Sequence, residues 1–379
     1  MSKKRAIFQE VSDSVKPIAS NSIGIIEKNS NEKIRNTIQL WLKTLFVLIV
    51  LIILVGGLTR LTDSGLSITE WKPITGALPP LSAESWATEF NKYKQIPEYK
   101  LQNEGMSLSE FKFIYWWEWG HRQLGRVIGL VWFFGFISLL FVKIQKPWRL
   151  RLLLIGVLIG VQGTVGWWMV SSGLTGTVLD VASYRLATHL GLAFIILGFI
   201  LWFILLLGRS ETFILQARRN AEPKFVFLSN GLLHLTFLQI LFGALVAGID
   251  AGRSYTDWPL MAGQFFPPDL FYLNPWWRNF FEDPGLVQFI HRMSGYILFI
   301  FCIYSWSSVR KSGNESLKFG FNLIFVIAFF QMVLGIVTVF YAAPWEIAIV
   351  HQFGAILLWV AVLRARFITK YPPNNALSK

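Results

Sequence analysis

The chain has 379 residues, of which 54% are hydrophobic and only 15% are charged. A soluble protein normally carries about a quarter charged residues, so this composition indicates an integral membrane protein. The formal net charge of +13 does not predict nucleic-acid binding, because no basic patch lies on a segment that would fold in water.

Eight apolar stretches approach the ~17–25 residues that a membrane-spanning helix requires. They lie near residues 41–59, 113–142, 152–171, 187–208, 225–249, 286–309, 319–341 and 345–363. The sequence therefore predicts an all-α integral membrane protein with eight transmembrane helices. The single cysteine, Cys302, lies in the sixth stretch, which excludes an intrachain disulfide and a CxxC motif.

Basic residues concentrate on one side of the predicted spans, which is normally the cytoplasmic side. They are found in the N-terminal tail, in the loops 143–151, 209–224 and 310–318, and in the C-terminal tail. We therefore expect both termini to be cytoplasmic. Residues 1–40 are polar with mixed charge, which indicates a cytoplasmic tail rather than a cleaved signal peptide.

Four short sequences recur in the same order in the two halves of the chain. GGLTRLTDSGLSITEW (56–71) matches GALVAGIDAGRSYTDW (243–258), HRQLGR (121–126) matches HRMSGY (291–296), QGTVG (162–166) matches QMVLG (331–335), and THLGLA (188–193) matches VHQFGA (350–355). This order predicts two tandem four-helix bundles, 41–208 and 225–364, with an inner linker at 209–224 and a C-terminal tail at 365–379. Because four spans is an even number, a pseudo-twofold axis along the membrane normal should relate the bundles.

Four of the five histidines fall at repeat-equivalent positions, namely His121, His189, His291 and His351. Each lies at the start of an even-numbered span, so all four should share one depth on the outer side. Two imidazoles in each bundle predict bis-histidine ligation of haem iron. The fifth, His234, has no counterpart, and we expect it to form a hydrogen bond inside the bundle.

Arg122 and Arg292 directly follow two of these histidines and would suit pairing with haem propionates. The alternative is a pair of interface arginines whose guanidinium groups reach water. A Gly or Ala lies four residues after each of the four histidines, on the same helical face. This leaves room for a flat porphyrin, although ordinary packing of small residues gives the same pattern.

The two halves differ at one position beside the histidines. Glu118 lies three residues before His121, on the same helical face, whereas the equivalent residue before His291 is Gln288. A carboxylate in only one half suits a proton acceptor or a group that stabilises developing positive charge. The alternative is an acid near a helix start, where the helix dipole favours it.

The motifs SGLSITEWKPITGALPP (64–80) and NEGMSLSEFKFIYWWEWGHRQLGR (103–126), with the four histidines, resemble the haem A synthase family over essentially all of 41–364. The resemblance implies an oxidoreductase of the bacterial inner (cytoplasmic) membrane that oxidises a methyl group of haem O to the formyl group of haem A, by successive hydroxylations. It implies haem b on His291 and His351, the substrate haem on His121 and His189, and catalysis by Glu118. Some family members carry a cysteine pair in an outer loop, which this chain lacks.

The resemblance also implies partners. These are the lipid bilayer, the synthase that supplies haem O, and an electron donor of unknown identity, and a homo-oligomer is left open. The long segments 60–112 and 250–285 would cover the substrate and cofactor halves, either as lids or as passive caps.

Two other functions fit parts of the sequence. A di-haem b-type cytochrome would pass electrons from quinol to an outer partner, but Glu118 opposite Gln288 favours the enzyme. A transporter would need broken helices and polar residues near the membrane midplane, and apart from His234 the predicted midplane is apolar.

Overall fold

The computed structural model describes residues 29–176 and 179–373. Eight helices in this part of the chain are long and apolar enough to cross a membrane. They are α1 (Asn29–Leu61), α4 (Leu108–Leu140), α5 (Lys146–Val170), α6 (Ser183–Leu207), α8 (Pro223–Gly248), α10 (Pro284–Val309), α11 (Glu315–Phe340) and α12 (Trp345–Lys370). The predicted all-α membrane protein with eight spans is confirmed.

Several helices extend beyond their predicted apolar stretches. The first helix begins at Asn29, so residues 29–40 of the expected tail are helical, and residues 1–28 lie outside the described part. The second span begins at Leu108, because the Ser107 hydroxyl accepts from the Glu110 N–H and the Glu110 side chain accepts from the Ser107 N–H. Such a capping box sets a helix start independently of hydropathy. The last span ends at Lys370, so it includes the first six residues of the expected C-terminal tail.

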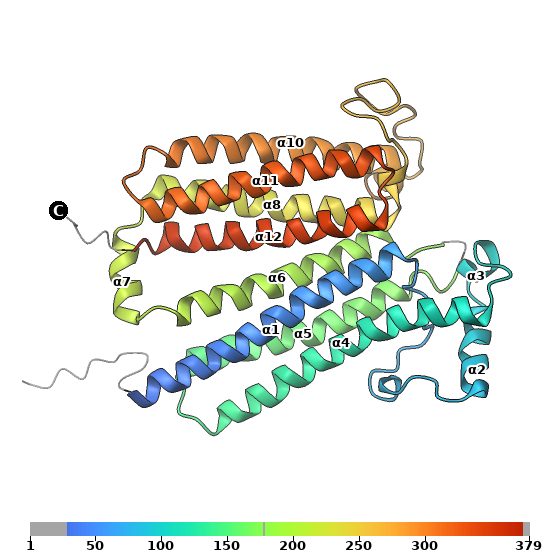
Figure 1. Ribbon diagram of the computed structural model, residues 1–379, viewed down its shortest axis with the longest axis horizontal. Helices are drawn as coiled ribbons and strands as arrows, with labels where there is room; N and C mark the ends of the chain where they lie inside the picture. Colours follow the sequence, from blue (N-terminus) through green and yellow to red (C-terminus); the bar gives the residue numbers. More distant parts are fainter. Residues whose placement is uncertain (1–28, 177–178, 374–379) are drawn as a thin grey trace, which may run out of the picture.

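Each half of the chain has the same pattern of neighbouring helices. In the first half, α1 and α5 each pack against α4 and α6; in the second half, α8 and α11 each pack against α10 and α12. Figure 1 shows these as two adjacent groups. The halves meet where α1 and α6 contact α8 and α12. This pattern supports two four-helix units, while the pseudo-twofold axis stays a prediction.

Side-chain hydrogen bonds cross the boundary between the halves. Trp359 Nε1 donates to the Phe194 carbonyl oxygen at 3.1 Å, and Gln352 Nε2 donates to the Ile53 carbonyl oxygen at 2.7 Å. One apolar core contains buried residues of α1, α5, α6, α8 and α12. The two units are therefore packed together as one body rather than joined only by a linker.

Shorter helices lie at both ends of the bundle. The helix α7 (Glu211–Arg219) lies in the expected linker, and α2 (Ala83–Tyr93) and α3 (Pro97–Leu101) lie at the opposite end (Figure 1). We call the end with α2 and α3 the outer end and the end with α7 the inner end. Further short elements are η1 (Thr75–Ala77), η2 (Ala251–Arg253), η3 (Trp276–Arg278) and α9 (Asn279–Glu282).

Residues 62–107, the first outer segment, have a hydrophobic core of their own. Leu66, Trp86, Phe90 and Tyr93 are buried against the first turns of α4, where Phe111 is buried too. Burial of these large rings contributes roughly 1.5–3 kcal/mol for each side chain. The segment is therefore a folded cap on the first half. Residues 249–283, the second outer segment, occupy the corresponding place in the second half.

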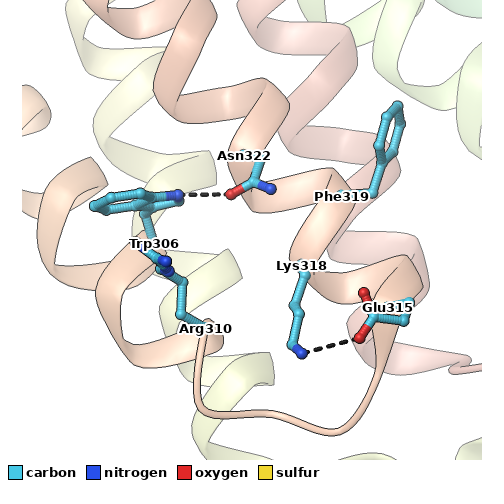
Figure 2. Close-up of a pocket in the computed structure, with 6 residues that line it drawn as sticks. All are labelled: Trp306, Arg310, Glu315, Lys318, Phe319 and Asn322. Atoms are coloured by element: carbon cyan, nitrogen blue, oxygen red, sulfur yellow. Dashed lines mark hydrogen bonds and ion pairs between the residues drawn. The ribbon is translucent and has the colours of Figure 1, made fainter.

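A pocket at the inner end lies between α10 and α11 and is shown in Figure 2. Trp306 Nε1 donates to Asn322 Oδ1 at 2.6 Å, and Lys318 pairs with Glu315 at 2.9 Å. The Arg310 guanidinium lies over the Trp306 ring. His291 lies near the start of α10, toward the outer end. This pocket is therefore separate from the histidines that the sequence singles out.

Candidate functional site

The structure brings the four predicted histidine ligands together as two pairs. His121 on α4 interacts electrostatically with His189 on α6, and His291 on α10 does so with His351 on α12. All four side chains are half-buried. His189, His291 and His351 lie in the second turn of their helices, toward the outer end. His121 lies deeper along its helix than expected, because α4 extends outward to Leu108.

Every one of these imidazoles lies against a glycine of the preceding span. A Cβ added at Gly56 would lie 3.0 Å from His121 Nε2, and one at Gly243 would lie 3.1 Å from His291 Cε1. Likewise, a Cβ at Gly166 would lie 2.9 Å from His189 Cε1, and one at Gly335 would lie 3.2 Å from His351 Cε1. These distances are shorter than ordinary carbon contacts. Because glycine has no side chain, each imidazole ring has room beside the preceding span.

Glutamine amides hold the backbone of three of the four histidines. The Nε2 atoms of Gln162, Gln239 and Gln331 donate to the carbonyl oxygens of His189 at 2.9 Å, His291 at 3.0 Å and His351 at 3.0 Å. Each glutamine lies four residues before the glycine that faces the same histidine. Glutamine, imidazole and glycine therefore form one recurring unit between neighbouring helices.

Glu118 is buried, with 3% of its surface exposed, and its carboxylate is fully hydrogen-bonded. Oε2 accepts from Ser67 Oγ at 2.7 Å and from the Ile68 N–H at 2.6 Å. Oε1 accepts from Arg122 Nε at 3.0 Å and from a second guanidinium nitrogen of the same residue. Amide and guanidinium N–H groups only donate, so the site is built to bind a carboxylate in a fixed orientation.

Arg122 also holds the first outer segment in place. Its guanidinium donates to the carbonyl oxygens of Glu70 at 2.8 Å and Ile68 at 2.7 Å. One turn further along α4, Arg126 donates to the carbonyl oxygens of Pro73 at 2.9 Å and Lys72 at 2.9 Å. The charged groups at the mouth of this span therefore bind the polypeptide that covers it.

The second half repeats these contacts without the acid. Arg292 donates to the carbonyl oxygens of Tyr255 at 3.0 Å and Asp257 at 3.0 Å, which are the repeat equivalents of Ile68 and Glu70. Gln288, in the place of Glu118, donates to the Tyr255 carbonyl oxygen at 3.0 Å. Within the described ranges, Gln288 Oε1 and Arg292 Nε have no hydrogen-bond partner. The halves thus share the contacts between this arginine and the outer segment, and they differ in charge at the position of Glu118 and Gln288.

The structure bears on three expectations about neighbouring residues. Both arginines bind backbone carbonyls of the outer segments, and propionate pairing stays a prediction. Gly125 and Gly295 face Ile52 and Gln239 of the preceding spans, so they allow close helix packing. His234 was expected inside the bundle, but its side chain is exposed and Nδ1 bonds the Asn230 carbonyl oxygen at 2.7 Å. That expectation was wrong, because its own helix satisfies the imidazole.

The residues present fit the ligation of haem iron. Each half supplies two half-buried imidazoles from non-adjacent helices, and paired imidazoles are a donor set for haem. Beside each ring, a glycine of the preceding span leaves empty the space that a Cβ would fill. His351 Nδ1 is buried and has no hydrogen-bond partner in the part of the chain that the structure describes. Within residues 29–176 and 179–373, side-chain hydrogen bonds reach these four rings only from Gln162 and Gln239.

Sequence reasoning singled out the histidines and Glu118 as candidates, but it missed the residues that contact them. The contacts of Ser67 and Ile68 with Glu118 join positions far apart in the chain. For Gln162 and Gln331 a signal existed, because both lie in the matched motifs QGTVG and QMVLG. Gln239 follows from the same rule, four residues before Gly243.

Comparisons with known proteins identify the family to which this chain belongs. Residues 39–363 match the family model described as cytochrome oxidase assembly protein. The heme A synthase of Dinoroseobacter shibae is 61% identical over 100% of this chain and 99% of its own length. The heme A synthase of Ruegeria sp. is 59% identical, covering 98% of each chain. That of Paracoccus denitrificans is 51% identical over 99% of this chain and 98% of its own. This chain therefore belongs to the haem A synthase family of cytochrome oxidase assembly proteins.

Proposed function

We propose that this protein is a haem A synthase, an oxidoreductase that converts a methyl group of haem O into the formyl group of haem A. Full-length relatives that carry this name support the proposal. The observation that carries it is the buried carboxylate of Glu118, which lies beside only one of the two histidine pairs in the described residues. Electron transfer alone gives no reason for that difference.

The two halves would have different roles. His291 and His351 would hold haem b, which supplies redox chemistry when bound, and His121 and His189 would hold the haem O substrate. The bundles would be related by a pseudo-twofold axis along the normal of a bacterial inner membrane, with both termini cytoplasmic. The basic inner loops, such as that around Arg310 and Lys318 (Figure 2), support this orientation. A haem O-supplying synthase and an electron donor would be its partners.

The fixed carboxylate explains how this chain's own residues would assist the oxidation. Glu118 and His121 lie three residues apart on one helical face, so a haem held by His121 would have the carboxylate beside its edge. There, Glu118 would stabilise positive charge developing at the methyl carbon or accept a proton from it. Ser67, Ile68 and Arg122 keep the carboxylate from rotating. The core of the first outer segment would exclude water.

The variant Glu118→Gln tests this role directly. Cells that express it with a source of haem O should accumulate haem O, with haem A formation lowered about 10²-fold or more. Extracted haems are separated by chromatography and identified by mass. The variant should fold, because the second half already contains a buried glutamine beside its arginine, Gln288 with Arg292. The haem b spectrum of the purified protein should therefore be retained.

The matched control is Glu110→Gln on the same helix. Glu110 is exposed at the helix start, and a glutamine preserves its capping box, so haem A formation should stay near the wild-type level. Wild-type protein that contains haem B and never produces haem A would instead identify a di-haem b-type cytochrome.

Substitution of the histidines tests the division between the halves. Replacing His291 or His351 should abolish the haem b spectrum, because each would supply one of the two imidazoles that hold this haem. Replacing His121 or His189 should leave that spectrum intact and lower conversion. Identical behaviour of all four variants would contradict the assignment of cofactor and substrate.

A further inference from the structure

His121 is the one ligand histidine in the described residues that lacks a glutamine tether. Gln162, Gln239 and Gln331 bond the backbone of the other three, between 2.9 and 3.0 Å. The repeat-equivalent position before His121 is Ile52, four residues before Gly56. The exception thus falls on the histidine that shares a helical face with Glu118.

At His291 the tether is a network of two side chains. Gln239 Nε2 donates to the His291 carbonyl oxygen at 3.0 Å and lies 3.1 Å from Nδ1 of the ring. Ser294 Oγ donates to Gln239 Oε1 and to the His291 carbonyl oxygen. The amide is therefore fixed at both ends, and it restrains the backbone and the ring of His291 together.

At His121 both members of this network are replaced by apolar residues. Leu124 stands in the place of Ser294, and Ile52 in the place of Gln239. The glycines confirm the correspondence in space: a Cβ at Gly125 would meet Ile52 at 3.7 Å, and one at Gly295 would meet Gln239 Nε2 at 3.3 Å. Ile52 and Leu124 pack against the main apolar core. No side-chain hydrogen bond reaches the His121 ring from the described parts of the chain.

We propose that this difference determines how long each half retains a haem. Tethered His291 and His351 form a site of slow release. Untethered His121 turns away from the iron more readily, so a haem in the first half exchanges faster while Gln162 keeps His189 in place. Outer contacts of this kind change metal affinity by about 10–100-fold. The inference rests on the proposed function only in naming the exchanging haem as substrate and product.

Haem release from the purified full-length protein in lipid nanodiscs tests the proposal without turnover. Both halves are loaded with haem B, and transfer to excess apomyoglobin is followed by absorbance. Two phases are expected, a fast one from the first half and a slow one from the second. The assignment is made with His121→Ala and His291→Ala, which should each remove one phase.

Two reciprocal variants then exchange the tether. Gln239→Leu combined with Ser294→Leu should accelerate the slow phase about tenfold. Ile52→Gln combined with Leu124→Ser should slow the fast phase by a similar factor. Misfolding would accelerate release, so slowing in the second variant cannot arise from damage to the fold.

Gln39→Leu is the matched control. Gln39 Nε2 also joins two helices through a backbone carbonyl, that of Ile204, at 3.1 Å, but it lies at the inner end. Its loss should leave both phases unchanged. The proposal is overturned if Gln39→Leu accelerates release as much as the Gln239 variant, or if the Ile52 variant leaves the fast phase unaltered.

Haem A formation, measured in parallel in cells, separates this inference from the proposed function. If the wild-type protein makes haem A but the tether substitutions do not change the rates of haem release, the inference alone is refuted. If the rates of haem release change with the tether substitutions as expected, but the protein never makes haem A, the proposed function alone is refuted.

Discussion

Two buried glutamates lie near each other in the chain's first half but have opposite surroundings. Glu118 has the Arg122 guanidinium beside it, whereas Glu98 on α3 has only neutral donors. Glu98 is 4% exposed, and its Oε1 accepts from Tyr93 Oη at 3.2 Å and Asn103 Nδ2 at 3.4 Å. In the described residues its Oε2 has no partner. Burial raises the pKa of Glu98 to about 8, so it is held mainly as the neutral acid at pH 7.

This raised pKa predicts that the first outer segment loses stability as the pH rises. Because the folded pKa lies above the ordinary value of 4.5, the folded state binds the proton more tightly than the unfolded state. The contribution of Glu98 to stability should therefore be fully present below pH 4.5, be lost between pH 4.5 and about 8, and stay absent above. The fall is at most about 1.4 kcal/mol per pH unit. Hydrogen exchange of α2 and α3 measures it, and Glu98→Gln should remove the slope.

At the scale of single residues, the sequence identified candidate site residues where the repeat allowed the two halves to be compared. Glu118 was found because Gln288 occupies the equivalent place, and the histidines because each has a counterpart. The partners Ser67 and Ile68 were not predicted, since their contacts depend on how the first outer segment folds back onto α4.

At the scale of the helices, contact between glycine and imidazole fixes where neighbouring spans approach. In α5, Gly166 faces His189, whereas an added Cβ at Gly163 would meet nothing within 4 Å. The two positions are three residues apart on one helix, so they separate a local steric effect from the general cost of replacing glycine. Hydropathy places such a helix in the membrane but does not tell which of its glycines is in contact.

We expect Gly166→Val to lower haem A formation about tenfold, because the new side chain displaces His189. An imidazole shifted by a few tenths of an ångström no longer lies in the best position for ligation. Gly163→Val should retain at least half of the wild-type conversion, and the haem b spectrum should be normal in both. Equal loss in the two variants would show that helix distortion, rather than contact with the ring, causes the effect.

Helix ends were the least predictable part of the elements. Apolar length located all eight spans, yet α1 and α4 start well before their apolar stretches. In α4 the S-x-x-E sequence Ser107–Glu110 was visible and would have marked the start. In α1 the polar first turns gave no such signal.

For the whole molecule, the boundary between the halves contains one charged cluster at the outer end. Arg60 of α1 is 12% exposed and pairs with Asp63 at 2.9 Å, Asp180 at 3.2 Å and Asp250 at 2.9 Å. Asp250 belongs to the second half, so the guanidinium joins the two units. Burial raises the pKa of Asp63 and of Asp180, although Arg60 opposes the rise. Within the described residues, Arg60 is thus the one cation that contacts all three carboxylates.

Arg60→Gln should destabilise this boundary by on the order of 1–3 kcal/mol, a value between those of exposed and buried ion pairs. The three carboxylates would then repel one another without a cation between them. Thermal unfolding in detergent, monitored by tryptophan fluorescence, measures the change. Arg253→Gln is the control, because Arg253 is half-exposed and only 4.0 Å from Asp250. An equally large effect there would indicate general surface electrostatics.

The repeat predicted the two units and their order, and the helix contacts agree with it. It did not predict the Arg60 cluster, because the equivalent of Arg60 in the second half is Ala247. A feature present in only one half, and formed between the halves, is not visible from internal similarity.

Glu118 is held by Ser67 and Ile68, which lie beyond the end of α1. The orientation of this buried carboxylate therefore depends in part on residues outside the predicted membrane spans. Substitutions near Ser67 would consequently shift the carboxyl group while the packing of the spans stays the same.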